Sequence, residues 1–111
     1  MKKKTKMNVS KGVMLWRRAK QFIPGGSQLL SKRSEMFLPE QWPSYYVKAR
    51  GIKAWDLDGK EYKDFSIMGV GSCALGYADS DVNRAVKAAV DNGSMSTLNS
   101  PEEVELAELL T

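Results

Sequence analysis

Apolar residues recur at helical spacing in the first third of the chain. Between Lys11 and Ile23 they share one stripe, while Arg17 and Lys20 fall on the other side. The stripe consists of Gly12, Leu15, Trp16, Ala19, Phe22 and Ile23. This spacing predicts an amphipathic helix. Pro24-Gly25-Gly26 ends it, because proline cannot continue the hydrogen-bond ladder and glycine allows a sharp exit.

Two further helices are predicted towards the C-terminus. From Ser80 onward one face is apolar, and Asn92-Gly93 supplies a stop signal. That face carries Val82, Ala85, Val86, Ala89 and Val90. At Ser100 the chain has an N-cap serine, a proline at the first helical position and Glu103 at the third. This is the capping-box arrangement, so a helix is expected to begin there.

The middle of the chain predicts a β-hairpin. Tyr45-Tyr46-Val47 leads into a strand over residues 52–57, and a second strand over 60–65 follows Asp58-Gly59. Asp-Gly between two such runs is a preferred two-residue turn. That turn would place Trp55 opposite Tyr62 and Lys53 opposite Asp64, an aromatic pair and a charge pair.

Two segments lack a clear period. Residues 27–43 are expected to form an extended, loop-like crossing, in which Trp42 covers either a dimer partner or nearby surface. Residues 65–77 are apolar and contain Gly69, Gly71 and Gly76. Residues 69–74 fit the G-x-G-x-x-A pattern of dinucleotide-binding turns, but no helix opens there, so close backbone packing is the better interpretation. Cys73 is expected to be a small buried hydrophobe, with a reactive thiol as the alternative.

Charge and composition exclude several classes of protein. The net charge of +4 arises mainly from five lysines within residues 1–11, which favour a solvated basic terminus over a nucleic-acid-binding arm. No apolar run follows these lysines, so we expect neither a signal peptide nor a membrane span, and a cytoplasmic location. One cysteine and no histidine exclude the usual Cys/His metal sites and a Cys-His nucleophile pair.

Other residues are expected to have structural roles. Trp16 and Trp55 are interpreted as core or interface anchors. Asp56, Asp58 and Asp64 alternate on the hairpin, but turn chemistry explains them better than a metal site. The last helix would be only about ten residues long, which is marginal alone, and its apolar residues have no later element to pack against. We therefore expect the chain to be a truncated part of a longer protein.

Four passages, in order, carry a resemblance to a known family. Residues 15–26 (LWRRAKQFIPGG) are similar to the opening helix and turn of glutamate-1-semialdehyde aminomutases. Residues 51–65 (GIKAWDLDGKEYKDF) resemble the hairpin of class III aminotransferases in general. Residues 75–77 with 81–86 resemble their L-G-H-x-H-P-x-V passage, and residues 100–108 (SPEEVELAE) resemble their P-x-E-x-E-L-A-E helix start.

This resemblance implies an α+β segment of an α/β pyridoxal-phosphate (PLP)-dependent transferase of fold type I. Residues 1–10 would be a flexible basic terminus, 11–99 part of the small domain, and 100–111 the start of a helix leading into a large domain. The full-length enzyme would be a homodimer that moves an amino group between small-molecule substrates through a PLP Schiff base. The catalytic lysine and the cofactor-binding residues would lie beyond Thr111, so no catalytic, cofactor-binding or metal-binding residue is assigned here.

Substrate-binding candidates follow from the same resemblance. Arg33 lies near the position of an arginine that binds the substrate carboxylate in the aminomutases, although an exposed basic loop is an equal alternative. Ser27, Gly69 and Val70 are the other candidates. Val70 stands near a family tryptophan, and Tyr77 replaces a family histidine. These departures favour an aminotransferase acting on another substrate.

A second hypothesis is not enzymatic. The chain could be a stand-alone interaction module derived from the beginning of such an enzyme. That would require these residues to fold alone, which the unmatched last helix argues against.

Overall fold

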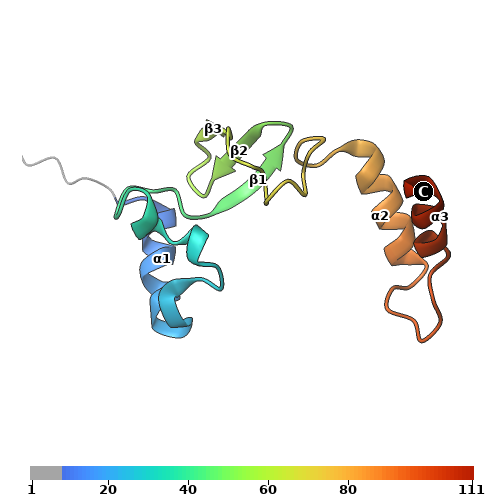
Figure 1. The fold of residues 1–111 in the computed structure, drawn as a ribbon. Helices are drawn as coiled ribbons and strands as arrows, with labels where there is room; N and C mark the ends of the chain where they lie inside the picture. The colour runs from blue at the N-terminus through green and yellow to red at the C-terminus, as the bar shows by residue number, and fades with distance from the viewer. Residues whose placement is uncertain (1–8) are drawn as a thin grey trace, which may run out of the picture. The chain divides into compact units, whose positions relative to one another are not determined.

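A computed structural model describes residues 9–111. Most of the expected basic terminus, residues 1–8, lies outside the described residues. The chain forms two compact units, the first ending at Ala78 and the second comprising Asp79–Thr111. Figure 1 shows the helices and strands along the chain, and each unit is described by itself below.

The first unit begins with helix α1 (Lys11–Phe22), as the hydrophobic period predicts. The Ser10 hydroxyl accepts a hydrogen bond from the Val13 amide at 3.3 Å and caps the helix. Val13 and Trp16 are the buried apolar side chains of the described residues. Phe22, expected on the core stripe, is 78% exposed. Val13, which the predicted stripe did not include, is buried instead.

Three short 3₁₀ turns follow α1: η1 (Pro24–Gly26), η2 (Leu30–Lys32) and η3 (Ser34–Met36). The expectation of an extended crossing was therefore wrong for this part of the chain. The turns are held against α1, since the Trp16 indole donates a hydrogen bond to Glu35 at 3.0 Å. Single 3₁₀ turns show no hydrophobic period, which explains why the sequence pattern did not reveal them.

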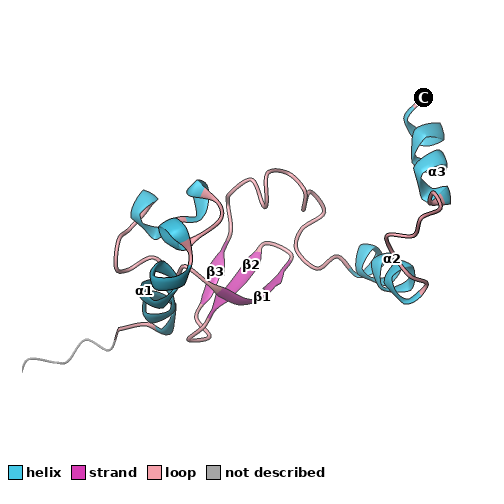
Figure 2. Ribbon diagram, turned by 90° about the horizontal axis from the view of Figure 1, so that it is seen from below, coloured by secondary structure: helices cyan, strands magenta, loops and turns pink. Residues whose placement is uncertain are grey.

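A three-stranded antiparallel sheet follows, in the order β1-β2-β3 (Figure 2). Its strands are β1 (Tyr46–Arg50), β2 (Lys53–Asp56) and β3 (Glu61–Lys63). Gly51 and Ile52 connect β1 to β2, and Gly51 has a φ of 56°. The predicted hairpin is confirmed as β2 and β3, and β1 extends it by one strand.

The predicted register of that hairpin was wrong by one residue. Trp55 pairs with Glu61 and Lys53 pairs with Lys63, so neither expected cross-strand pair forms. Lys53 instead forms an ion pair with Glu61 at 2.9 Å.

The cause of the shift is the Asp56 side chain. One of its oxygens accepts the backbone amides of Asp58 and Lys60, both at 2.9 Å. This arrangement favours a three-residue loop, residues 57–59, which ends at Gly59 with a φ of 82°. The loop has one residue more than a two-residue turn, and every cross-strand partner changes accordingly. Turn chemistry thus accounts for Asp56, as the sequence suggested.

The second unit contains two helices, α2 (Ser80–Asp91) and α3 (Pro101–Leu110). Asp79 caps α2 by accepting the amides of Asp81 and Val82, each at 3.0 Å. Both predicted helices are confirmed, as is the stop at Gly93, which has a φ of 94°. The capping box was wrong, because the Ser100 hydroxyl donates to the Glu102 carboxylate and makes no capping bond to the backbone.

Among residues 9–111, no helix is both long and apolar enough to span a lipid bilayer.

The Asp56 carboxylate offers a test of the hairpin geometry. We expect Asp56→Ala to lower the free energy of unfolding by about 1–3 kcal/mol, because two turn amides and the Tyr62 hydroxyl lose their acceptor. Asp56→Asn keeps one oxygen for the turn amides and should lose clearly less. Thermal denaturation of both variants measures the difference. Equal losses would show that the turn amides do not depend on this side chain.

Candidate functional site

The first candidate position is the turn after α1, where Arg33 lies across the glycines of η1. A Cβ atom built on Gly25 would lie 2.1 Å from the Nη2 atom of Arg33. Gly25 has a φ of 72°, which a residue with a side chain rarely adopts. The glycine therefore allows both the backbone turn and the close approach of the guanidinium.

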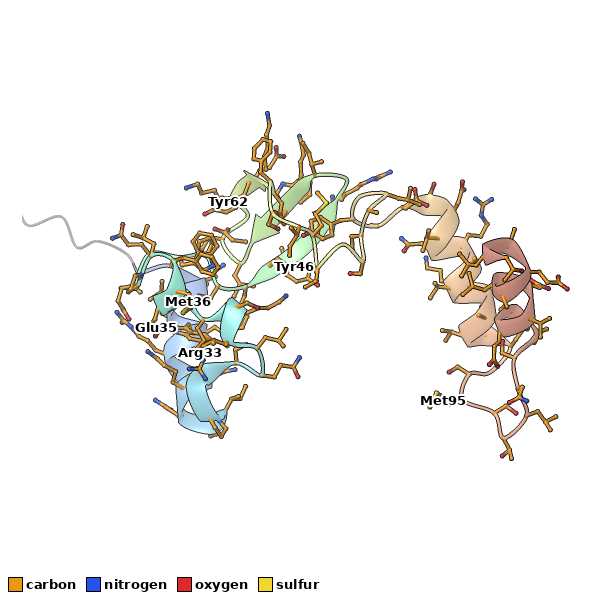
Figure 3. All side chains as sticks on the ribbon, in the orientation of Figure 1. Arg33, Glu35, Met36, Tyr46, Tyr62 and Met95 are labelled. Atoms are coloured by element: carbon orange, nitrogen blue, oxygen red, sulfur yellow. The ribbon has the colours of Figure 1, made fainter. Side chains whose placement is uncertain are left out.

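Arg33 is half-buried, so it is not the freely exposed loop residue of the alternative interpretation. Its Nε atom is buried and has no hydrogen-bond partner among the described residues. An unpaired N–H of a charged group is costly, because such groups are normally hydrogen-bonded when they leave water. The position of Arg33 beside Glu35 and α1 is visible in Figure 3.

Glu35 provides the negative charge in this region. Its Oε1 atom accepts hydrogen bonds from the Trp16 indole and from the Lys20 ammonium, both at 3.0 Å. The indole bond contributes most, and together with a backbone hydrogen bond at Glu35 and the bond from Lys20 it lowers the pKa of Glu35 to about 2. The carboxylate is thus ionised at neutral pH and engaged by α1, while the guanidinium of Arg33 lies over Gly25.

Ser27, the second candidate, lies just after the glycines. It is half-buried, and its hydroxyl accepts the Leu29 amide at 3.3 Å. In this arrangement the side chain stabilises the chain between η1 and η2. Ser27 and Arg33 thus belong to the same group of turns beside α1.

Gly69 and Val70 lie elsewhere, in the loop that follows β3. Figures 1 and 2 show this loop and the turns after α1 in separate parts of the first unit. Val70 is 86% exposed and has a φ of 60°. The structure therefore brings the four candidates together in two pairs, and it does not join the pairs into one cluster.

A further pair of residues, which no sequence pattern indicated, lies next to this loop. Tyr77 was noted only as a departure from the family pattern, but its hydroxyl donates to Asp64 Oδ2 at 2.5 Å. Residues 64 and 77 are separated by the whole loop, and no short-range pattern connects them. The only available signal was the unusual tyrosine itself.

The cysteine and the three tryptophans singled out in the sequence differ in how far they are buried. Cys73, expected to be buried, is only partly so. Trp42 stacks on Phe37, with ring centroids 4.4 Å apart and an interplanar angle of 15°, and it is 37% exposed. Trp16 is an anchor as predicted, at 3% exposure. Trp55 is partly exposed and lies beneath the ammonium group of Lys48, 4.8 Å from the ring centroid.

Comparison with known proteins connects this geometry to a family. The chain is 35% identical over 100 residues to the glutamate-1-semialdehyde 2,1-aminomutase of Aquifex aeolicus, a match that covers 90% of the chain and 23% of that protein. Over this segment the chain is homologous to aminotransferases of the glutamate-1-semialdehyde aminomutase type. No protein-family model matches it.

Solved structures agree with this assignment. An omega-transaminase from Sphaerobacter thermophilus superposes with a TM-score of 0.78 at 32% identity, covering 92% of this chain and 22% of that one. The PLP internal aldimine form of the FumI protein from a Sphingopyxis species has a TM-score of 0.74 at 32% identity, covering 87% and 23%. The predicted fold class, a segment of a fold type I transferase, is confirmed.

The extent of the match limits what it implies. This chain spans about a quarter of the length of the relatives it matches. The homologous aminotransferases therefore contain most of their residues outside the aligned segment.

The low pKa of Glu35 leads to a pH prediction. A carboxyl group whose folded pKa is about 2, below its ordinary value of 4.5, contributes stability above pH 4.5. That stability is lost as the pH falls from about 4.5 towards 2. We expect Trp16→Phe to raise the pKa of Glu35 towards its ordinary value, and Lys20→Gln to raise it less. NMR titration of the Glu35 carboxyl carbon tests this, and an unchanged pKa in Trp16→Phe would contradict it.

Proposed function

We propose that the protein is a PLP-dependent aminotransferase, to which residues 9–111 contribute one segment. The observation that carries the proposal is 35% identity over 90% of the chain to an aminomutase of this type, together with superposition on a solved transaminase at a TM-score of 0.78. In such enzymes the cofactor forms a Schiff base with a lysine and acts as an electron sink. The reaction transfers an amino group between two small molecules.

We propose that the Schiff-base lysine lies outside the described residues. Such a lysine is activated by desolvation or by another cation nearby. All described lysines are exposed except Lys53, which is half-buried and paired with Glu61 at 2.9 Å. The Lys53 ammonium is thus already engaged by a carboxylate. The roles proposed for these residues are therefore in substrate binding.

Arg33 is the residue of this segment that we propose to bind substrate. Its partly buried guanidinium has an unpaired Nε beside Gly25, and a guanidinium binds a carboxylate through two parallel hydrogen bonds. A substrate carboxylate would give this donor the partner it lacks among the described residues. Ser27 would line the same position, and Gly69 and Val70 would contact the substrate from the loop after β3.

The reaction we favour is transamination rather than an intramolecular aminomutase reaction. The basis is the set of departures at Arg33, Val70 and Tyr77, together with the likeness to an omega-transaminase. We also propose that the enzyme acts as a homodimer. The alternative, a non-catalytic interaction module, has no support in the comparisons.

Cofactor binding is the direct test of this function. We expect the full-length gene product to show the visible absorbance of bound PLP, and borohydride to attach the cofactor to a lysine outside residues 9–111. Incubation with an amine donor and a separate 2-oxo acid should move the amino group between them. A protein that binds no PLP contradicts the proposal. Conversion of one substrate without an acceptor would instead indicate an aminomutase.

The role of Arg33 leads to a second test. Loss of a bidentate charged contact costs about 1.5–3 kcal/mol, so Arg33→Gln should raise KM for carboxylate substrates by roughly tenfold to a hundredfold. Lys32→Gln, one residue earlier, is the matched control and should leave KM unchanged. An equal effect of both variants would assign the result to general charge.

Gly25 and Gly59 allow a complementary comparison. Both have a left-handed φ, but a Cβ on Gly25 would meet Arg33, whereas a Cβ on Gly59 has no heavy atom within 4 Å. Gly25→Ala should therefore weaken carboxylate binding, while Gly59→Ala should affect only stability.

A further inference from the structure

The loop after β3 begins and ends at one point of the sheet, the turn Gly51-Ile52. The Asp64 amide donates to the Ile52 carbonyl at 2.7 Å. At the other end Gly51 and Tyr77 exchange two backbone hydrogen bonds, of 2.8 and 2.9 Å. A Cβ atom on Gly76 would lie 3.1 Å from the Cα of Gly51, so the two backbones are in close contact. Residues 65–76 therefore form a closed loop, which we call the glycine loop.

One carboxylate connects the two ends of the glycine loop. Asp64 Oδ1 accepts the Ser66 amide at 2.8 Å, and Oδ2 accepts the Tyr77 hydroxyl at 2.5 Å. The bond to Asp64 raises the pKa of Tyr77 to about 12, and bonds from Ser66 and Tyr77 lower the pKa of Asp64. The phenol thus stays protonated and the carboxylate ionised throughout the neutral range. This is the state in which the hydrogen bond is strongest.

The interior of the glycine loop has an uncommon conformation. Four consecutive residues have positive φ: Met68 (42°), Gly69 (70°), Val70 (60°) and Gly71 (80°). A β-branched residue such as Val70 is a clear outlier there. Such a conformation persists only where the surrounding structure holds it, and residues of this kind cluster at functional sites.

The hydrogen bonds inside the loop are short-range, and they include the amide of Cys73 donating to the Met68 carbonyl and that of Gly76 donating to the Cys73 carbonyl. Ser72 donates its hydroxyl to the Gly69 carbonyl at 2.8 Å, and the Gly71 amide donates to the Ile67 carbonyl at 2.6 Å. The side chains of Ile67 and Val70 are 70% and 86% exposed, so they do not bury apolar surface that would stabilise it. The attachment of the loop's two ends to the sheet restrains it from its base.

We propose that Asp64 and Tyr77 are positioning residues for substrate binding, which hold the glycine loop closed so that Gly69 and Val70 face the substrate. This inference rests on the proposed function, because the substrate contact of the loop belongs to that proposal. The pair acts through the loop and does not touch the substrate itself.

The test uses the full-length gene product with Tyr77→Phe, Asp64→Asn and the double variant. Tyr62→Phe is the matched control, since Tyr62 also donates its hydroxyl to a carboxylate of the sheet, Asp56, at 2.9 Å. Two measurements are made on each protein. Amide hydrogen exchange over residues 66–76 reports loop closure without any cofactor chemistry. Steady-state kinetics with an amine donor report KM and kcat separately.

We expect exchange in the glycine loop to become about tenfold faster in both single variants, from the loss of one charge-assisted hydrogen bond. KM should rise about tenfold while kcat changes less than about twofold. The double variant should match either single variant, because the two residues act as a pair. Tyr62→Phe should leave loop exchange and KM as in the unmodified protein.

The two proposals can fail separately. If the unmodified protein binds PLP and transfers amino groups, an unchanged KM in Tyr77→Phe overturns the positioning role. Unchanged exchange overturns loop closure whether or not PLP is bound. If the unmodified protein binds no PLP, the proposed function fails and the substrate role of the pair fails with it, while the exchange data still decide whether the pair closes the loop.

Discussion

The burial of Trp16 against the turns that follow α1 is the interaction on which the first unit depends. Its indole ring is 3% exposed, and a Cβ atom on Gly26 would lie 2.8 Å from it. Val13 is the other buried apolar side chain of the described residues. With so little apolar surface buried, the hydrophobic effect alone gives this segment limited stability. The turns therefore depend strongly on specific hydrogen bonds.

Acidic side chains make many of those bonds. Glu35 connects η3 to the Trp16 indole, and Asp56 shapes the loop between β2 and β3. Asp58, in the hairpin loop, accepts the Lys11 amide at 2.9 Å and so connects the sheet to the start of α1. Carboxylates can do this because one oxygen accepts several N–H groups at once. Burial works to raise the pKa of Asp56, yet the hydrogen bonds from Lys60, Tyr62 and Asp58 outweigh it and lower the value.

In the second unit, large apolar side chains of both helices remain exposed. Val82, Val86 and Val90 of α2 are 47–61% exposed, and Leu109 and Leu110 of α3 are 84% and 78% exposed. Contiguous apolar faces of this kind usually mark contact surfaces. In the proposed enzyme we expect the remainder of the fold or the second subunit to cover them. The predicted domain boundaries at residues 10 and 99 stay predictions.

The sequence by itself determined where α1, α2, α3 and the hairpin lie, because helical period, caps and turn residues act over a few neighbouring positions. It also carried the family resemblance, through motifs distributed along the chain. Only the tertiary structure decided the hairpin register, the packing of Arg33 over Gly25 and the bond between Asp64 and Tyr77. Each of these features depends on a contact between a side chain and a group that a turn or loop places next to it. The register, for example, changed because the Asp56 carboxylate accepts hydrogen bonds from two amides of its own turn. The local sequence pattern does not predict such contacts, because their geometry is set only when the chain has folded back on itself.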